Sequence, residues 1–407
     1  MLSTEDQLHV IKSGGATIVP EAALRQKLDR GGQLRVKLGV DPTAPDLHLG
    51  HAVPLRKLRQ LQDIGHQVVL IIGNGTALIG DPSGRNSTRP PLSAEQIAVN
   101  AQTYVDQAFK ILDKDKTELV WNGDWLTPLD LKAILHLASH FTVARILERD
   151  DFSNRYKAQQ SISLHEFLYP VMQAYDSVEV RADIELGGSD QLFNLLAGRE
   201  LMEKLGMEPQ VCLTLPLLEG TDGVQKMSKS YGNYIGISDE PDDMFGKVMS
   251  IPDDLMPRYY YLASTLPVDE IDAIVEGLAN GSLHPNRVKR QLAANIVAAY
   301  HGAVAATAAE ANFDKLFKDK ELPEEIEEVE VALTPGDDGL VYVPGVLVGL
   351  GFAASAGEAR RLIDGGGVKL AGEALNTGEY NVDPSRLAGQ VIQVGKRKYA
   401  RIKKHQG

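Results

Sequence analysis

The 407-residue chain has only one cysteine, Cys212, and lacks an uninterrupted apolar run long enough to cross a membrane. A single cysteine excludes an internal disulfide and a zinc site built from cysteines, which is typical of a reducing compartment. The opening residues, MLSTEDQLHVIKSGG, carry acidic side chains and no apolar core, so they do not form a signal peptide. Residues 340–357 are uncharged, but Pro344 and several glycines interrupt them. We expect a cytoplasmic protein without a membrane segment.

The chain also lacks a positive charge balance, because its formal net charge is −13. This value argues against a protein that coats nucleic acid indiscriminately, although it leaves room for a local basic surface. Hydrophobic residues make up 43% and charged residues 24%, as in ordinary globular proteins. At about 150 residues per domain, the length predicts two to three domains.

The first 240 residues alternate β-rich runs with helical patterns. The run 34–40 is followed by a helical pattern over 50–64 and by the apolar run 68–73, which predicts a right-handed βαβ unit. Runs at 180–186 and 211–218 are further candidate strands. The fold class is therefore α/β, with a Rossmann-like doubly wound parallel sheet that binds ligands at the carboxyl ends of its strands. A helical stretch over 94–151 is predicted to be an insertion.

Three further regions follow the sheet region 1–240. Residues 241–320 have helical patterns throughout, and 321–340 is predicted to be an acidic linker, because seven acidic residues and one lysine lie between Asp319 and Glu330. Residues 341–407 form a small α+β domain, with a capping box at Ser355 and Glu358 and hairpins near Gly372 and Gly395. From position 384 to the end there are seven basic residues and no acid, at positions 386, 396, 397, 398, 401, 403 and 404.

The first chemical motif is LGVDPTAPDLHLGH, where a strand ends and a helix begins. His48 and His51 are one helical turn apart, so they face the same side, and Gly50 between them allows a flat ring to approach the backbone. With Thr43 and the helix N-terminus, the two imidazoles supply donors for phosphate oxygens. Taken alone, a surface helix pair or a metal site explains these two histidines as well as a phosphate site does.

The second motif is GVQKMSKSYGN, a loop flanked by glycines. Its basic and hydroxyl side chains, Lys226, Ser228 and Lys229, can close over a polyphosphate and neutralise the charge that builds up as it leaves. Taken alone, a solvated basic loop is the more common explanation. The occurrence of both motifs around one βαβ sheet favours the phosphate site.

HLGH and KMSKS resemble the two signatures of the class I aminoacyl-tRNA synthetases. GTALIGDPSGR, YPVMQAYDS and GGSDQLFN resemble the bacterial tyrosyl-tRNA synthetases in particular, and the tail resembles the RNA-binding fold of a ribosomal small-subunit protein. The resemblance implies ATP, L-tyrosine and tRNA(Tyr) as substrates, Mg²⁺ with ATP, no tightly bound cofactor, no metal-ligating residues of the protein itself, and a homodimer with the insertion at its interface. It also implies a two-step ligase that forms tyrosyl-adenylate and then charges tRNA.

The resemblance assigns the ATP side of the site residue by residue. Thr43, His48, His51, Lys226 and Lys229 are the implied catalytic residues, which stabilise the triphosphate and the leaving pyrophosphate. The implied ATP-binding set is Gly39, Asp41, His48, Gly50, His51, Asp190, Lys226, Ser228 and Lys229.

The amino-acid side of the site is assigned in the same way. Asp81, Tyr169 and Gln173 are implied to hold the α-ammonium, and their oxygens are acceptors that an ammonium needs. Asp176 is implied to accept a hydrogen bond from the phenol hydroxyl of the substrate. A phenylalanine substrate lacks this hydroxyl and would leave the acceptor unpaired. The remaining implied tyrosine contacts are Lys37, Thr76 and Gln191, with Arg89 at a further contact position.

Two positions depart from the family pattern. Lys37 stands where many relatives carry a tyrosine that meets the substrate phenol, so its side chain is expected either to donate to that hydroxyl or to point to solvent. Arg85 stands where a lysine is common, which keeps a basic residue with a different geometry. Cys212 and four histidines at positions 66, 136, 140 and 165 are expected to be structural or exposed.

The helical region and the tail are expected to hold tRNA, with Arg360, Arg361, Lys369, Lys396, Arg397 and Lys398 as the implied contacts. Three other functions remain open on sequence alone. A tryptophanyl-tRNA synthetase shares the scaffold, although Gln173 and Asp176 argue against it. A small-molecule nucleotidyltransferase would lack the helical region and the basic tail. A non-catalytic RNA-binding protein predicts a damaged signature, whereas both motifs are intact.

Overall fold

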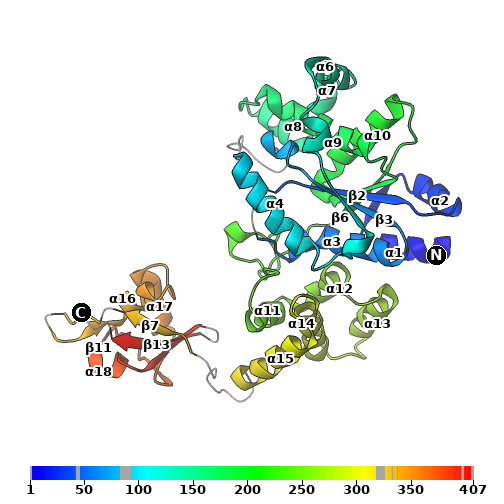
Figure 1. The fold of residues 1–407 in the computed structure, drawn as a ribbon. Helices are drawn as coiled ribbons and strands as arrows, with labels where there is room; N and C mark the ends of the chain where they lie inside the picture. The colour runs from blue at the N-terminus through cyan, green and yellow to red at the C-terminus, as the bar shows by residue number, and fades with distance from the viewer. Residues whose placement is uncertain are drawn as a thin grey trace. The chain divides into compact units, whose positions relative to one another are not determined.

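The computed structural model describes residues 2–42, 46–82, 93–317, 326–331, 333–336, 338–395 and 398–404. The chain divides into two compact units, residues 1–310 and 311–407 (Figure 1). No helix within these described ranges combines the length and the apolar character that a membrane span requires.

The first unit is built on a six-stranded sheet with the order β1-β6-β5-β2-β3-β4. Its strands are β1 (Thr17–Val19), β2 (Arg35–Val40), β3 (Gln67–Ile72), β4 (Thr117–Trp121), β5 (Ile184–Gly188) and β6 (Val211–Leu215). All neighbours are parallel except β1, which pairs antiparallel with β6. The predicted doubly wound α/β sheet is therefore confirmed.

The predicted elements around the first motif are confirmed to within one or two residues. Helix α3 (Leu49–Asp63) connects β2 to β3, and its side chains Leu55, Leu58 and Leu61 are fully buried. Strand β5 begins later than predicted, because Arg181 adopts a positive φ of 49° at the turn after α9 (Leu168–Glu179). Helix α10 (Leu192–Lys204) follows β5 and packs against α9. In Figure 1, α9 and α10 lie on one side of the sheet and α3 on the other.

The segment predicted as a purely helical insertion contains a sheet strand, so that prediction is wrong in part. After α4 (Ala94–Ala108), the run TELVW forms β4, which pairs parallel with β3 from Val68↔Thr117 to Ile72↔Trp121. Its five side chains are all half-buried, as expected at the edge of a sheet. Short helices follow, namely α5 (Gly123–Leu126), α6 (Leu131–Ser139), α7 (Val143–Ile146) and α8 (Asp150–Lys157).

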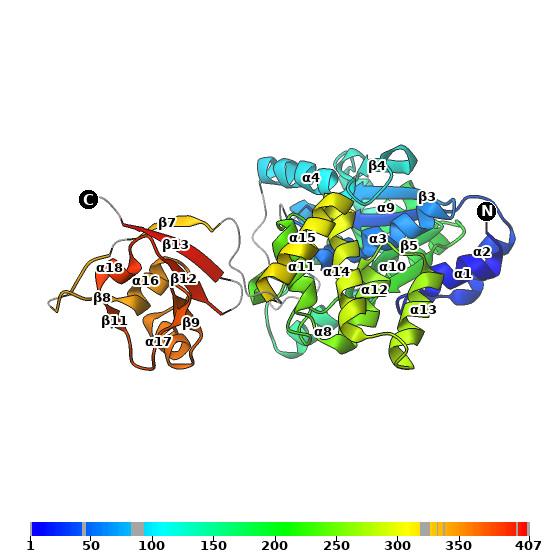
Figure 2. The same ribbon diagram turned by 90° about the horizontal axis from the view of Figure 1, so that it is seen from below.

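The predicted helical region is confirmed as helical, but it is not a separate compact unit. It comprises α11 (Pro241–Met249), α12 (Met256–Ala263), α13 (Val268–Ala279), α14 (Pro285–His301) and α15 (Ala303–Phe317). Helix α12 packs on α3, and Tyr259 donates a hydrogen bond to the backbone oxygen of Glu219 at 2.7 Å. Figure 2 shows α12 and α14 beside α3. Tyr259 and Tyr260 of α12 are fully buried. The boundary between the two compact units therefore falls after residue 310, and not at residue 241 as predicted.

The second unit has a five-stranded sheet with the order β10-β9-β12-β13-β7 and a separate β8–β11 pair. Helix α17 (Ala356–Asp364) begins at Ser355, whose hydroxyl accepts from the backbone N–H of Glu358. Both predicted hairpins are present, joining β9 (Val368–Leu370) to β10 (Glu373–Ala374) and β12 (Val391–Val394) to β13 (Lys398–Lys404). The other elements are β8 (Val341–Tyr342), α16 (Val343–Gly349), β11 (Asn381–Val382) and α18 (Pro384–Leu387).

The predicted acidic linker 321–340 is wrong over its second half. Strand β7 (Glu328–Val331) pairs parallel with β13, with Glu328 opposite Arg401. The sequence EVEV alternates, so that Val329 and Val331 pack on the core of this unit while Glu328 and Glu330 are exposed. Counting charge alone hides this period of two. Residues 318–325 lie outside the described part of the chain.

Candidate active site

A cavity of about 420 Å³ opens at the carboxyl ends of the parallel strands. Its wall includes the last residues of β2, β5 and β6, and the first residues after β3 and β4. This is the position at which open α/β sheets bind ligands. Eleven of the predicted site residues line it: Gly39, Asp41, Gly50, His51, Thr76, Asp81, Tyr169, Gln173, Asp176, Asp190 and Gln191.

Asp176 lies at the buried end of the cavity, where only 2% of its surface is exposed. The indole N–H of Trp125 donates to one carboxylate oxygen at 2.9 Å, and the amide of Asn122 donates to the other at 3.1 Å. Burial raises the pKa of Asp176 to about 6, against the opposing effect of the Lys37 ammonium and these two donors. At neutral pH, Asp176 is therefore an ionised acceptor held in a fixed orientation.

Asn122 and Trp125 are site residues that the sequence analysis missed. Asn122 follows β4 directly, and its amide also donates to Thr76 at 3.0 Å while its oxygen accepts from the backbone N–H of Gly75. The sequence signal that could have indicated Asn122 is the strand pattern of the preceding run, TELVW. Once TELVW is recognised as a strand, the residue after it belongs at the ligand-binding edge of the sheet.

Asp41 sits between two hydroxyl donors at the middle of the cavity. Thr76 donates to one oxygen at 2.7 Å and Tyr169 to the other at 2.9 Å. Burial and the neighbouring charge of Asp81 raise the pKa of Asp41 to about 7, although the two hydrogen bonds oppose this shift. The hydroxyl of Tyr169 is thereby oriented with its proton toward Asp41, so its lone pairs are available to a ligand.

A network of polar side chains connects Asp81 to the start of α10. Gln191 donates to Asp81 at 3.0 Å, and Asn194 donates to Gln191 at 2.9 Å. The guanidinium of Arg149 lies 3.5 Å from Asp81 and donates to Asn194 at 3.1 Å. Burial and the charge of Asp81 raise the pKa of nearby Asp190. The carboxylates make this part of the cavity suited to a cationic group.

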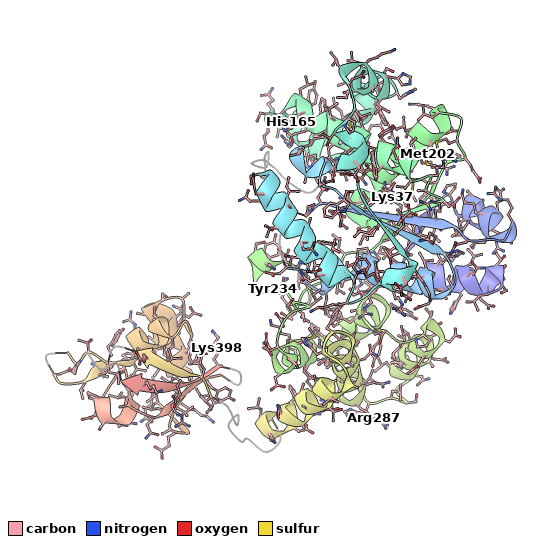
Figure 3. The ribbon with its side chains drawn as sticks, in the orientation of Figure 1. Lys37, His165, Met202, Tyr234, Arg287 and Lys398 are labelled. Carbon is pink, nitrogen blue, oxygen red and sulfur yellow. The ribbon has the colours of Figure 1, made fainter. Side chains whose placement is uncertain are left out.

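Lys37 follows neither of the two expected arrangements. Its side chain is fully buried within the sheet, so it does not point to solvent (Figure 3). The ammonium forms an ion pair with Glu185 at 2.7 Å and donates to the hydroxyl of Ser177 at 2.8 Å and the backbone oxygen of Gln173 at 3.3 Å. An ammonium has three donors, and all three are occupied. Lys37 is also absent from the cavity wall, which corrects its assignment as a direct tyrosine contact.

His48 and His51 lie at the rim of the cavity, on one side of α3 as predicted. Their rings stack with centroids 3.8 Å apart. Burial lowers the pKa of His48 to about 3 and that of His51 to about 4, and the nearby Lys229 ammonium adds to both shifts. Both rings are therefore neutral at neutral pH. Because Nδ1 of His51 accepts from the backbone N–H of His48 at 3.4 Å, its proton lies on Nε2.

The KMSKS loop is joined directly to the segment that carries the two histidines. Leu49 donates to the backbone oxygen of Ile235, and Ile237 donates to that of Leu47. Lys229 reaches across to Asp46 at 2.8 Å and lies 6.0 Å from the ring of Tyr234. The positive charge of Lys226 opposes the rise in the pKa of Asp190, so these two side chains are close to each other. The two motifs, far apart in sequence, are thus brought to one rim.

Two glycines of the sequence motifs lie where an added side chain would be crowded. A Cβ on Gly50 would lie 3.1 Å from the His48 ring. Gly223 has a positive φ of 74°, and a Cβ there would lie 2.5 Å from Pro252. Both are positions where the sequence motifs placed a glycine.

The other predicted residues lie outside the described part of the chain, on the second unit, or at structural or exposed positions of the first unit. Thr43, Arg85, Arg89, Lys396 and Arg397 fall outside the described residues. Arg360, Arg361, Lys369 and Lys398 are exposed on the second unit. Cys212 is fully buried in β6, and His66 accepts from the backbone of Leu34, so both have the expected structural positions. His136 and His140 contact each other edge to face, and His165 is exposed.

Among the described residues of the cavity wall, no three metal-ligating side chains have their ligand atoms close together. Among the described residues, the only group of three metal-ligating side chains whose ligand atoms lie close together is His9, Asp269 and Asp272. These residues are on α1 (Thr4–Lys12) and α13, away from the cavity wall.

Comparisons with known proteins agree with this geometry. Residues 29–318 match the family model described as tRNA synthetases class I (W and Y). The chain is 50% identical to the tyrosine–tRNA ligase of Moorella thermoacetica, over 97% of this chain and 95% of that protein. It is 48% identical to the tyrosine–tRNA ligase of Thermotoga maritima, over 98% of each.

Solved structures with the same fold include the tyrosyl-tRNA synthetase of Archaeoglobus fulgidus complexed with L-tyrosine. It matches with a TM-score of 0.62 and 24% identity, over 76% of this chain and all of that one. A truncated mitochondrial tyrosyl-tRNA synthetase of Aspergillus nidulans matches with a TM-score of 0.63 and 23% identity, over 77% and 94%. At these identities the two structures support the fold alone. The family model and the full-length relatives show that the chain belongs to the tyrosyl-tRNA synthetases of class I.

Proposed function

We propose that this chain is a tyrosine–tRNA ligase, which activates L-tyrosine with ATP and transfers it to tRNA(Tyr). The observation that carries the proposal is the oriented Asp176 carboxylate at the closed end of the cavity. Its two oxygens already accept from Trp125 and Asn122, and each oxygen has a further lone pair for the hydroxyl of a phenol. Two relatives that are 50% identical in sequence are named tyrosine–tRNA ligases.

The activation step is chiefly one of positioning and charge stabilisation. The tyrosine carboxylate attacks the α-phosphate of ATP, the bond to the β-phosphate breaks, and pyrophosphate leaves with the electron pair. Asp81, Tyr169 and Gln173 supply acceptors for the α-ammonium, which holds the carboxylate for attack. The neutral His51 donates from Nε2 without carrying charge, whereas Lys229 and Lys226 supply positive charge to the leaving phosphates.

Mg²⁺ is proposed to enter with ATP, because the described residues of the cavity wall do not include three metal-ligating side chains whose ligand atoms lie close together. Asp41 and Asp81, two carboxylates of the cavity wall, already accept from Thr76, Tyr169 and Gln191. An ion that keeps most of its waters and binds phosphate oxygens fits this arrangement.

The second step transfers the tyrosyl group to a terminal ribose hydroxyl of tRNA(Tyr), and we propose that the second unit contributes to tRNA binding. On β13, alternate side chains face outward, so Tyr399 and Arg401 share the solvent side of the sheet with Lys369 of β9, from which β12 separates them. Arg360 and Arg361 are exposed on α17. Phosphate contacts of this kind position RNA without selecting its sequence. Some of the basic residues are compensated, because Lys403 pairs with Glu328 and Arg386 with Glu379.

We also propose that the chain works as a homodimer in the cytoplasm. Four apolar side chains on α6, α7 and the segment after α8 are largely exposed: Leu131 at 72%, Leu135 at 60%, Val143 at 63% and Leu164 at 82%. Large exposed apolar side chains close in sequence are typical of an interface. Light scattering at micromolar concentration should give twice the mass of one chain, and a monomer would overturn this part of the proposal.

The central experiment is ATP–pyrophosphate exchange with each amino acid in turn. Exchange with tyrosine alone is the expected result, followed by charging of tRNA(Tyr) when that RNA is added. Exchange with tryptophan would support the tryptophanyl enzyme. Absence of exchange with every amino acid would instead support a binding protein on a synthetase scaffold.

A further inference from the structure

A buried ion pair lies directly beneath the amino-acid end of the cavity. Lys37 of β2 and Glu185 of β5 are partners in the register of the parallel sheet, and their side chains are 0% and 1% exposed. Removing two charges from water is costly, and an apolar pair of similar size often serves stability equally well. A role beyond stability is therefore worth seeking in what this pair contacts.

The carboxylate of Glu185 is saturated with donors. One oxygen accepts from Lys37 at 2.7 Å and from the side-chain amide of Gln173 at 3.1 Å. The other accepts from the hydroxyl of Ser177 at 3.0 Å and from the amide of Gln210. This arrangement depends on the absence of a side chain at Gly198 of α10, where a Cβ would lie 2.7 Å from the Gln210 amide.

The contact with Gln173 determines which end of its amide faces the cavity. An ionised carboxylate only accepts hydrogen bonds, so Gln173 must turn its NH₂ group toward Glu185 and its oxygen away. That oxygen is buried and has no hydrogen-bond partner among the described residues, although Gln173 forms part of the cavity wall. A buried acceptor without a partner is costly until a ligand supplies a donor.

We propose that Lys37 and Glu185 are positioning residues that lock the Gln173 amide with its oxygen toward the substrate ammonium. The proposal rests on the function proposed above, in which an amino acid occupies this cavity. Lys37 contributes by holding Glu185 in place through its three hydrogen bonds, without touching the substrate. If the carboxylate became an amide, Gln173 could rotate and present two N–H groups to the ammonium, which would weaken binding.

The decisive variant is Glu185→Gln, measured by tyrosine-dependent ATP–pyrophosphate exchange. We expect the KM for tyrosine to rise at least tenfold, while kcat and the KM for ATP change less than twofold. A purely structural role would lower stability and leave the KM for tyrosine unchanged, and that result would overturn the proposal. The unsubstituted protein is assayed first, so that absence of any exchange contradicts the proposed function and not this inference.

Two further variants keep the test sharp. The first is the double variant Gln173→Glu with Glu185→Gln, which exchanges the two side chains. The amide introduced at position 185 can donate to the carboxylate introduced at position 173, so an acceptor again faces the substrate. We expect the KM for tyrosine to return to within about threefold of the original value, and failure of this rescue would contradict the proposal. If Glu185→Gln does not fold, Lys37→Met with Glu185→Leu removes both charges together, and it should still raise the KM for tyrosine.

A matched control is Lys27, another buried lysine of the first unit, which pairs with an acidic residue just before β5. Lys27 is 3% exposed and pairs with Asp183 at 2.9 Å, away from the cavity wall. Lys27→Met should lower thermal stability and leave the KM for tyrosine unchanged. An equal rise in that KM would show that any buried ion pair of this unit affects the site, and the proposal would fall.

Discussion

The closed end and the rim of one cavity are built in opposite ways. At the closed end, Asp176 accepts two hydrogen bonds from neutral donors and is almost fully buried. At the rim, Lys229 makes one ion pair with Asp46, and both side chains are more than one-third exposed. A buried group held by two hydrogen bonds has one orientation, so it can select a substrate. An exposed lysine on a loop can move, so it can follow charge that develops on phosphate.

The largest expected effect is at the rim, in the chemical step. His48→Ala removes a neutral ring that stacks on His51, and we expect adenylate formation to slow by about 10²–10³-fold, as for loss of one donor to a developing charge. The affinity for tyrosine should change less than twofold. Single-turnover kinetics and equilibrium tyrosine binding measure the two quantities separately.

The control for this variant is His165→Ala, which replaces an exposed histidine that is not part of the cavity wall. It should leave both quantities unchanged. If His48→Ala weakens tyrosine binding as strongly as it slows the reaction, the division of labour between rim and closed end is wrong.

The next effect is at the closed end and should appear in binding. In Asp176→Asn the new NH₂ group must face a donor, either Trp125 or Asn122, so the acceptor array is disrupted. A hydrogen bond to a charged group contributes about 1.5–3 kcal/mol, which corresponds to a rise of roughly 10–150-fold in the KM for tyrosine. The KM for ATP should not change. Glu179→Gln, on the exposed end of the same helix, is the control, and an unchanged KM for tyrosine in Asp176→Asn would remove Asp176 from the pocket.

The pH dependence distinguishes the two regions without any substitution. Because the pKa of Asp176 is about 6, it is an ionised acceptor above that value and loses this role as it is protonated below it. The KM for tyrosine should therefore rise below pH 6, approaching tenfold per pH unit. The histidines, with pKa values of about 3 and 4, stay neutral over this range. A rise in KM that persists in Asp176→Asn would assign the titration to another group.

The smallest effect is expected outside the cavity, on the second unit. Lys369→Ala should leave ATP–pyrophosphate exchange unchanged and weaken tRNA binding by at most about 1 kcal/mol, with the salt dependence of binding reduced by about one unit of slope. Filter binding at several salt concentrations measures this. Glu373→Ala, on the adjacent strand of the same hairpin, should not weaken binding, and a loss equal to that of Lys369→Ala would exclude a specific phosphate contact.

Much of the cavity could be predicted because its motifs lie where strands become helices. His48, Gly50 and His51 follow β2, and Asp190 and Gln191 follow β5, so local sequence determines both their chemistry and their edge of the sheet. Asn122 and Trp125 were not predicted as site residues, because the strand that precedes them was not recognised. The half-buried edge strand β4 was assigned to a helical segment, so the residues after it were not placed at that edge.

Charge counts predicted less well than hydrophobic periodicity. The run of acids before residue 330 indicated a linker, but the alternating valines of β7 bury one face of the strand against the second unit. Its glutamates then lie beside β13, where Glu328 pairs with Lys403. Thus part of the basic character of the C-terminal segment is compensated by the segment predicted to be a linker.

The sequence by itself determined the sheet, the two phosphate-binding motifs and the family, because these depend on local patterns and spacing. Only the tertiary structure decided the roles of Lys37 and Glu185. They are 148 positions apart, and only the pairing of β2 with β5 brings their charges together away from water. Burial also decided that His48 and His51 are neutral, since a pKa depends on the surroundings of the group and not on its motif.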